Sequence, residues 1–434
     1  MRSILGIAAL ALSAAVASAQ QRARPPLGAS TVDTLRLTRR AAIARALIAN
    51  PQLDIAREQT EQVRAQRMEG ISLPDPSLST SWDSLPGPFR LGRASSRSTS
   101  LGLVVPFPDK LRLRNTIGVS NLRSSEQQYR LVQQQIEAQA GRSYDSVLVT
   151  RLHRRDLTEA RTLAEEFLKR TQARFNAGSV ARLDVIKAQV ELAQADNDLI
   201  ASARDVANAE AALNRVLGRP LALPIEPLDS LAAPPALPDL AAVEASALRT
   251  RPELLALEAQ QRAAKANSTL TRENSILPDI VLGANRDLMV PEAGTWYSAG
   301  LSMTLPVFFW QHRRGDFAET HHRELELAAT VRDAQAAVGQ DVRAAFATAD
   351  AAQRQVAFLR DQLLPSAREA YRAATVSYGL GGLSALEVLD TRRTLLDAER
   401  QYADALAAAN SARSDLARAA GVPLSTLAPG ASRE

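Results

Sequence analysis

The two halves of the chain carry the same series of short motifs, and this internal repeat limits the folds that are open to it. The series begins with an Ala-Leu pair, continues through two proline motifs and an aromatic residue, and ends with two glycines. Its matched positions are Ala46-Leu47 and Ala247-Leu248, Pro74-Asp75 and Pro278-Asp279, Pro106 and Pro306, Phe175 and Tyr378, Gly178 and Gly381, and Gly218 and Gly421. The matched positions are about 200 residues apart. Two copies of that length are too few and too long for a solenoid. We therefore expect two copies of one large structural unit.

The repeat divides the chain into two units with a proline-rich connector between them. We expect the first unit over residues 37–220 and the second over residues 239–423, with the connector at 221–238. Because proline cannot continue a helix, a connector so rich in proline is expected to be extended. Residues 20–36 then form an N-terminal extension, and residues 424–434 a C-terminal tail.

The first residues have the three parts of a secretory signal peptide. Arg2 supplies the positive charge, residues 4–16 are apolar, and Ala17-Ser18-Ala19 is a cleavage site, so residues 1–19 should be removed. No later stretch of about 18 uninterrupted apolar residues follows. The exported chain is therefore expected to enter a membrane, if at all, through strands.

Each unit contains two segments in which apolar and polar residues alternate, at about residues 77–85, 98–106, 279–288 and 296–305. One side of each segment is apolar and the other is small or polar, as in a tilted membrane strand with one side toward lipid. Alternation alone would also fit two soluble amphipathic hairpins. The residues expected to face lipid are Leu78, Trp82, Leu101, Leu103, Ile280, Leu282, Leu301 and Met303.

Aromatic residues stand where the interfaces of a membrane would lie. Trp296 and Tyr297 mark one end of the last segment, and residues 308–310 mark the other. Four strands cannot close a barrel in one chain, and an open sheet edge is not tolerated in lipid. A membrane protein with this pattern must therefore be an oligomer whose strands close one shared barrel.

The remainder of each unit is helical and unusually long. Residues 109–175 contain no proline and would form a helix on the order of 100 Å in length. Residues 315–378 are the counterpart, interrupted at most by Pro365, and residues 38–69 and 239–273 are also helical in pattern. Such helices need neighbours along their whole length. The fold class is therefore mainly α with a small β part.

The composition argues against several other classes of protein. The absence of Cys excludes disulfides, thiolate metal sites and thiol catalysis, and interleaved charges with a net +5 do not indicate nucleic-acid binding. His321 and His322 are adjacent on a helix, so their side chains diverge and make a poor metal pair. No G-x-S-x-G motif is present. We expect no enzyme activity, no cofactor and no metal site.

Taken together at matched positions, these motifs resemble those of the outer-membrane factors of the TolC family, the exit ducts of tripartite efflux pumps and type I secretion systems. The resemblance spans about residues 37–423 and is carried above all by the motifs around Phe175 and Tyr378. It implies a homotrimer with twelve strands in one outer-membrane β-barrel and a periplasmic α-barrel of long helices. The implied partners are a periplasmic adaptor (membrane fusion) protein, an inner-membrane efflux pump and outer-membrane lipid.

The resemblance also implies roles for residues at the two helix turns. The residues that match a gate or constriction are Asp184, Tyr378, Glu387 and Asp390. Those that match adaptor-docking tips are Gly178, Ser179, Gly381 and Gly382. Leu383 stands where some members have a gating Arg, so this chain departs from the pattern there.

A soluble periplasmic coiled-coil adaptor or scaffold is the alternative, and each acid at the turns could equally be a solvated surface carboxylate. Two helical hairpins in tandem, with strands at the opposite end, favour the duct. No motif in the sequence identifies its cargo.

Overall fold

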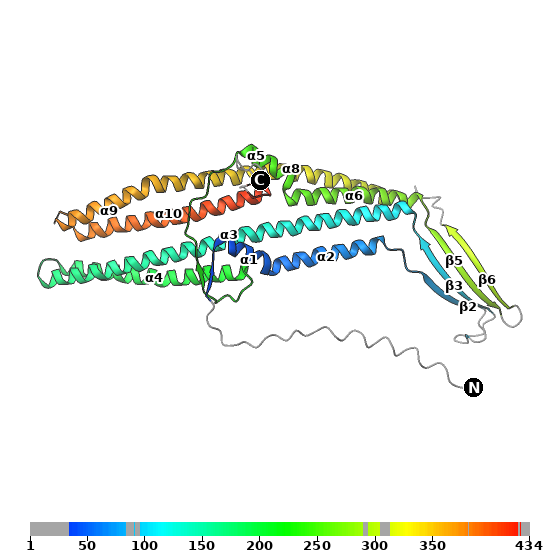
Figure 1. Ribbon diagram of the computed structural model, residues 1–434, viewed down its shortest axis with the longest axis horizontal. Coiled ribbons are helices and arrows are strands. Elements are labelled where there is room, and N and C mark those ends of the chain that lie inside the picture. The colour runs from blue at the N-terminus through cyan, green and yellow to red at the C-terminus, as the bar shows by residue number, and fades with distance from the viewer. Residues whose placement is uncertain are drawn as a thin grey trace, which may run out of the picture.

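The computed structural model describes residues 34–83, 91, 96–289, 294–303, 313–380, 382–423 and 426. The molecule is a long bundle of helices with a small sheet at one end and two helix turns at the other (Figure 1). The expected signal peptide, the aromatic residues 308–310, Gly381 and nearly all of the expected C-terminal tail lie outside the described residues.

The first half contains two short helices, a strand pair and a helical hairpin. Helices α1 (Arg39–Ala49) and α2 (Pro51–Ile71) lead to strands β2 (Ser77–Asp83) and β3 (Ser96–Val105). Helix α3 (Pro108–Asn176) then runs the length of the molecule, and α4 (Arg182–Val216) returns along it.

The second half has the same order of elements. Helices α5 (Leu240–Thr250) and α6 (Pro252–Ile276) lead to strands β5 (Ile280–Met289) and β6 (Gly294–Met303). A long helical run then extends to the turn, and α10 (Ala385–Ala420) returns. The strands lie within one or two residues of the predicted segments wherever both are described.

The helical segment before each strand pair is two helices, not the single one that the pattern predicted. The break falls before Pro51 in the first half and before Pro252 in the second. Proline at the first position of a helix lacks only an N–H that would be unpaired there anyway. Asn50 caps α2, since its side chain accepts a hydrogen bond from the Gln52 N–H at 2.9 Å.

Pro365 does not break the long helical run of the second half. Helix α8 (Arg314–Phe358) continues through a π-helical turn, η2 (Leu359–Leu363), into α9 (Leu364–Gly379). The N–H of Leu364 bonds the carbonyl of Leu359, five residues back. A π turn is a known way to pass a local obstruction without ending a helix.

The main sheet joins the two halves of the chain. Its order is β2-β3-β5-β6, with every neighbouring pair antiparallel. The central pair, β3 and β5, comes from different halves, and Leu103 lies opposite Leu282. Strands β2 and β6 are the edges.

A second, parallel pair was not predicted. Strand β1 (Leu35–Leu37) pairs with β4 (Ile225–Pro227), which lies inside the expected extended connector. Each strand has three residues, too few for any alternation to be visible in the sequence.

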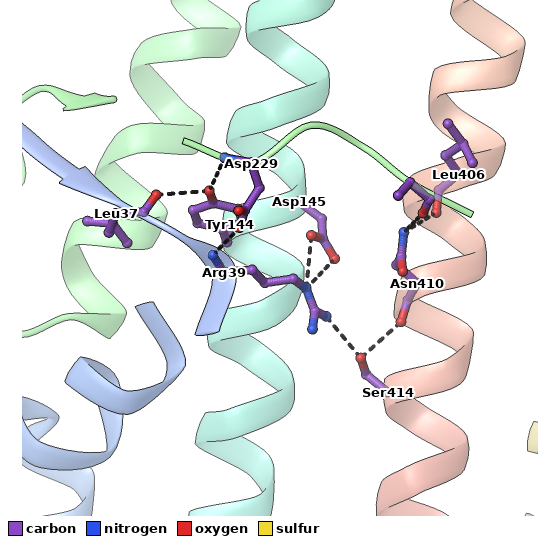
Figure 2. A network of polar contacts seen from close by, with 9 residues as sticks. Leu37, Arg39, Tyr144, Asp145, Asp229, Leu406, Asn410 and Ser414 are labelled. Carbon is purple, nitrogen blue, oxygen red and sulfur yellow. Dashed lines mark hydrogen bonds and ion pairs between the residues drawn. The ribbon is translucent and has the colours of Figure 1, made fainter. Parts of the chain in front are cut away.

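A partly buried polar network ties the connector to both halves (Figure 2). Arg39 in α1 forms an ion pair with Asp145 in α3 at 3.1 Å and donates to Ser414 in α10 at 3.1 Å. Its backbone N–H donates to Asp229 of the connector at 2.5 Å, and the Asp229 N–H donates to the Tyr144 hydroxyl at 3.3 Å. Burial raises the pKa of Asp145 although the Arg39 charge opposes the shift, and burial likewise raises the pKa of Tyr144.

Apolar packing is concentrated around this middle region. One cluster includes Ile136, Val147 and Leu213 from the first half and Ile225 from the connector. A second includes Val243, Val342 and Leu416 with several alanines from the second half. No helix in the described part of the chain combines the length and the apolar character that a membrane crossing requires.

Candidate functional site

The turn between α3 and α4 is a tight reversal closed by two backbone hydrogen bonds. The N–H of Gly178 bonds the Phe175 carbonyl and the N–H of Ser179 bonds the Arg174 carbonyl, both at 2.9 Å. Gly178 has a φ of 74°, a left-handed conformation that glycine adopts without strain. This is a Schellman motif, so the glycine in the sequence motif has a direct structural reason.

The turn between α9 and α10 lies at the same end of the molecule. Here the N–H of Gly382 bonds the Ser377 carbonyl at 2.9 Å, which again spans five residues. Gly381, the other predicted tip glycine in this turn, is outside the described residues.

A side-chain contact connects the two turns. The guanidinium of Arg174, at the end of α3, donates a hydrogen bond to the hydroxyl of Tyr378, at the end of α9, at 3.2 Å. The two residues border a cavity of about 250 Å³ between the turns, which Asp184 and Leu383 also line. Two of the predicted gate residues, Asp184 and Tyr378, therefore share one cavity. This chain has Leu383 where some members of the resembled family have an Arg, and the guanidinium in this cavity belongs to Arg174 of the other half.

The predicted gate acid Glu387 has a local role that we did not foresee. Its carboxylate accepts hydrogen bonds from the Ser384 N–H and the Ser384 hydroxyl, each at 2.7 Å. The Ser384 hydroxyl in turn accepts from the Glu387 N–H at 3.4 Å, which completes a capping box at the start of α10. Both hydrogen bonds from Ser384 lower the pKa of Glu387, and the bond from the backbone N–H has the larger effect. The sequence signal was the Ser-x-x-Glu spacing.

The other two acids differ from Glu387. Asp184 accepts from the Ala181 N–H at 3.3 Å, a weaker version of the same cap at the start of α4. Asp390 is exposed one turn further along α10. Asp184 and Glu387 thus each cap a helix, whereas the carboxylate of Asp390 has no described capping function.

Ion pairs join the hairpin of the first half to the hairpin of the second. Arg393 of α10 pairs with Glu191 of α4, and the neighbouring Arg392 pairs with Glu159 of α3 at 2.8 Å. The sequence interpretation missed both pairs. The available signal was Arg393 itself, a charged residue whose counterpart in the first half of the repeat, Val190 of α4, is apolar.

At the opposite end, the strand register determines the face on which each residue lies. Residues directly opposite each other in an antiparallel pair lie on the same face. Leu78 lies opposite Leu101, Leu103 opposite Leu282, and Leu282 opposite Leu301. With the alternation along each strand, all the predicted lipid-facing residues share one face, and among them Leu78 is 72% exposed and Leu301 68%. The other face carries mainly Ser, Gly and Asn.

Trp296 and Tyr297 do not form one girdle. They are consecutive on β6, so the first lies on the polar face opposite Asp287 and the second on the apolar face opposite Arg286. Both are well exposed.

No arrangement typical of metal binding lies in the described ranges. There, no group of three or more His, Cys, Asp and Glu side chains is placed to hold an ion. The rings of His321 and His322 are 5.8 Å apart and tilted by 54°, on an exposed stretch of α8.

Comparison with known families and proteins gives a consistent result. The model of the family described as outer membrane efflux protein matches residues 42–219 and 244–422. The cobalt-zinc-cadmium resistance protein CzcC of Cupriavidus metallidurans is 26% identical over 388 residues, which cover 84% of this chain and 85% of CzcC. The pyoverdine export outer membrane protein OpmQ of Pseudomonas aeruginosa is 26% identical over 65% of this chain and 60% of OpmQ.

The fold is also that of a solved channel. The outer-membrane channel OprN superposes with a TM-score of 0.75 at 19% identity, covering 89% of this chain and 90% of OprN.

Proposed function

The chain belongs to the outer membrane efflux protein family, and from that premise we propose that three copies surround one axis and form a continuous exit duct. As a member of this family, the protein is an efflux channel of the outer membrane and not an enzyme. In the proposed trimer each copy contributes four strands to a shared twelve-stranded barrel. The long helices of the three copies enclose a tunnel through the periplasm.

The sheet is the observation that carries this proposal. Its apolar face is exposed, its polar face bears small residues, and its two edge strands, β2 and β6, each have one described partner strand. An unpaired edge is not tolerated in lipid, whereas the edge of a second copy satisfies it. The eight residues predicted to face lipid then form the outer surface of the barrel.

The proposal is tested by locating and sizing the protein. We expect it in the outer-membrane fraction, as a detergent-solubilised oligomer with three times the chain mass by light scattering. A periplasmic protein that needs no detergent would contradict this proposal and favour the coiled-coil scaffold instead.

We further propose that the turns at the far end receive the adaptor, which links the duct to the inner-membrane pump. Of the tip set Gly178, Ser179, Gly381 and Gly382, the three described residues, 178, 179 and 382, lie in the α3–α4 and α9–α10 turns, at the end most distant from the sheet (Figure 1). Gly178 faces open space, since a Cβ built on it meets no atom within 4 Å. Gly178→Trp should therefore abolish efflux in cells while leaving the trimer and its membrane insertion unchanged. Loss of insertion would instead assign this turn to the folding core.

The gate is proposed to lie at the same turns. There Asp184, Tyr378, Glu387 and Asp390 of three copies would surround the axis, and the Arg174–Tyr378 hydrogen bond would hold the two hairpins of each copy together. Separation of the hairpins would then widen the tunnel.

For cargo, we propose divalent metal cations as the first class to test. The support is the likeness to CzcC, a cobalt-zinc-cadmium resistance protein, over most of both chains. Deletion of the gene should increase sensitivity to zinc, cobalt or cadmium salts. Unchanged metal tolerance combined with loss of pyoverdine export would favour an OpmQ-like role.

A further inference from the structure

Two arginines lie on the otherwise apolar face of the sheet, at the end away from the helices. Arg97 of β3 lies opposite Trp82 and Leu288, and Arg286 of β5 lies opposite Thr99 and Tyr297. The register places both on the face that carries Leu101 and Leu282. They are the only charged residues on that face in the described part of the sheet.

The two side chains are close enough to act on one group. Because Arg97 pairs with Leu288, Arg286 is its diagonal neighbour on the adjacent strand. Such neighbours are separated by about 7–8 Å, which two Arg side chains readily bridge. Arg97 donates one hydrogen bond, from Nη2 to the Leu91 carbonyl at 3.4 Å, and its buried Nε has no hydrogen-bond partner.

The acids at this end of the sheet lie on the other face. Asp287 follows Arg286 on β5, and Asp83 follows Trp82 on β2, so alternation directs both to the polar face. At the end of the sheet away from the helices, the arginines therefore lie on the apolar face and the carboxylates on the polar face. An anionic group that approaches the apolar face meets two guanidinium groups and no described carboxylate.

The distance of the two arginines from the helix-side end of the sheet indicates at which level of a membrane they would lie. Val105 is the last residue of β3, at the end of the sheet next to the helices. Arg97 lies eight residues from it along the strand, toward the end of the sheet away from the helices. At about 3.3 Å per residue, with a tilt of about 40°, it stands roughly 20 Å above the helix-side end of the sheet. This is near the far side of the apolar band of a membrane barrel, where Arg is tolerated at about 0–1 kcal/mol. Trp82 and Tyr297 beside the arginines fit the same interfacial level.

We propose that Arg97 and Arg286 together bind the phosphate of an anionic lipid headgroup in the outer leaflet. Guanidinium groups bind phosphate oxygens in bidentate geometry, and two neighbouring guanidinium groups can bind one phosphate together. The inference rests on the proposed function, because it requires the apolar face to meet lipid. A trimer would carry three such sites, one at the β3–β5 pair of each copy.

The test uses the purified full-length trimer in a nonionic detergent after removal of bound lipid. Native mass spectrometry with added phosphatidylglycerol should show up to three lipids retained by the wild-type trimer. The double variant Arg97→Gln with Arg286→Gln should need at least ten times more lipid for the same occupancy. The matched control replaces Arg45 and Arg372, two exposed arginines of the helical body, by Gln and should behave as wild type.

Additional experiments distinguish a lipid headgroup from free phosphate, and a lost binding site from a folding defect. Zwitterionic phosphatidylcholine and inorganic phosphate should not compete; effective competition by inorganic phosphate would overturn a lipid-headgroup site. Equal phosphatidylglycerol occupancy in wild type and double variant would also overturn it. Arg97→Lys with Arg286→Lys keeps the charge and should retain part of the affinity, which guards against a folding defect. Failure of the wild-type protein to form a trimer or to insert into liposomes would reject the proposed function itself.

Discussion

The α-carbon of Gly218 lies so close to Ala49 that a Cβ built on it would be 2.3 Å from the Ala49 carbonyl oxygen. Gly218 lies two residues after the end of α4 and has a φ of 65°, and Ala49 is the last residue of α1. The second half repeats this contact, since a Cβ on Gly421 would lie 2.8 Å from the Thr250 hydroxyl and 3.0 Å from the Arg251 N. In each half, the matched glycine at the end of the unit therefore fits against the helix junction at its beginning.

Gly218→Ala should lower the melting temperature of the trimer markedly. The left-handed conformation alone costs a residue with a Cβ about 1–2 kcal/mol, and the contact with the Ala49 backbone adds to that. Thermal unfolding followed by circular dichroism measures the loss. Gly178→Ala is the matched control, because Gly178 has a similar φ of 74° but faces open space. Equal effects of the two substitutions would show that the contact with Ala49 contributes nothing.

The internal repeat also predicts how two copies pair. Within the chain, Gly102 of β3 lies opposite Gly283 of β5. The proline motifs match β3 to β6 and β5 to β2, so Ser302 should lie opposite Ser79 of the next copy. Because the chain has no Cys, Ser79→Cys with Ser302→Cys should form disulfides on oxidation and give covalent dimers and trimers on a denaturing gel.

Two control pairs define the register in that experiment. Ser100→Cys with Asn285→Cys, which lie opposite each other within one chain, should cross-link without any increase in mass. Ser81→Cys with Ser302→Cys is displaced by two residues and should react much less. A higher yield for the displaced pair would mean that the neighbouring copy pairs in another register.

The apolar face of the sheet makes a third prediction. Leu301→Arg places a charge among apolar residues on the exposed face, level with Leu103 and two residues from the helix-side end of β3. There it should cost less than the roughly 2–4 kcal/mol that Arg costs at the membrane midplane. The yield of detergent-resistant trimer in the outer-membrane fraction measures the effect. Ser302→Thr, one residue further on the polar face, should be mild. An unchanged trimer in Leu301→Arg would contradict the assignment of this face to lipid.

Much of the architecture was accessible from the sequence because it depends on local periodicity. The change from helical spacing to strict alternation located all the main-sheet strands, and the absence of proline located α3. Phe175 and Tyr378, matched only by position in the repeat, lie at the two helix turns of the same end. The strands and α3 need only the neighbours of each residue along the chain, whereas the two turns were located through the internal repeat and the family resemblance.

What the sequence did not predict depends on partners far away in it. The β1–β4 pair joins residues nearly two hundred positions apart, and Arg393 with Glu191 joins two hairpins. The break before Pro51 and the π turn before Pro365 show the same residue type ending a helix in one place and not in another. At Pro51 the side chain of Asn50 supplies a cap, whereas just before Pro365 the helix continues through a π turn in which the Leu364 N–H bonds the Leu359 carbonyl.

The buried carboxylate of Asp145 predicts a dependence on pH. Burial raises its pKa in the folded state, so between the unfolded and the folded pKa the folded protein binds more protons. The stability from this group is therefore fully present below the unfolded pKa and is lost as pH rises through the folded pKa. The melting temperature of wild type relative to Asp145→Asn should rise as pH falls from about 7 to about 4. A difference that does not change with pH would contradict the shift.

The acids at the turns predict the ion selectivity of the duct. The effect of charge can be tested apart from the effect of helix capping there, because different residues carry the two roles. Fixed carboxylates around a narrow aqueous constriction attract cations and repel anions, so the trimer in a planar bilayer should prefer cations and be blocked by multivalent ones. Asp390→Asn removes a carboxylate that has no described capping role and should shift the reversal potential across a salt gradient toward zero. Ser384→Ala disrupts the cap of α10 but retains the charge of Glu387, so it should leave the reversal potential unchanged. Identical reversal potentials in wild type and Asp390→Asn would place this carboxylate on the solvated outer surface, away from the conducting path.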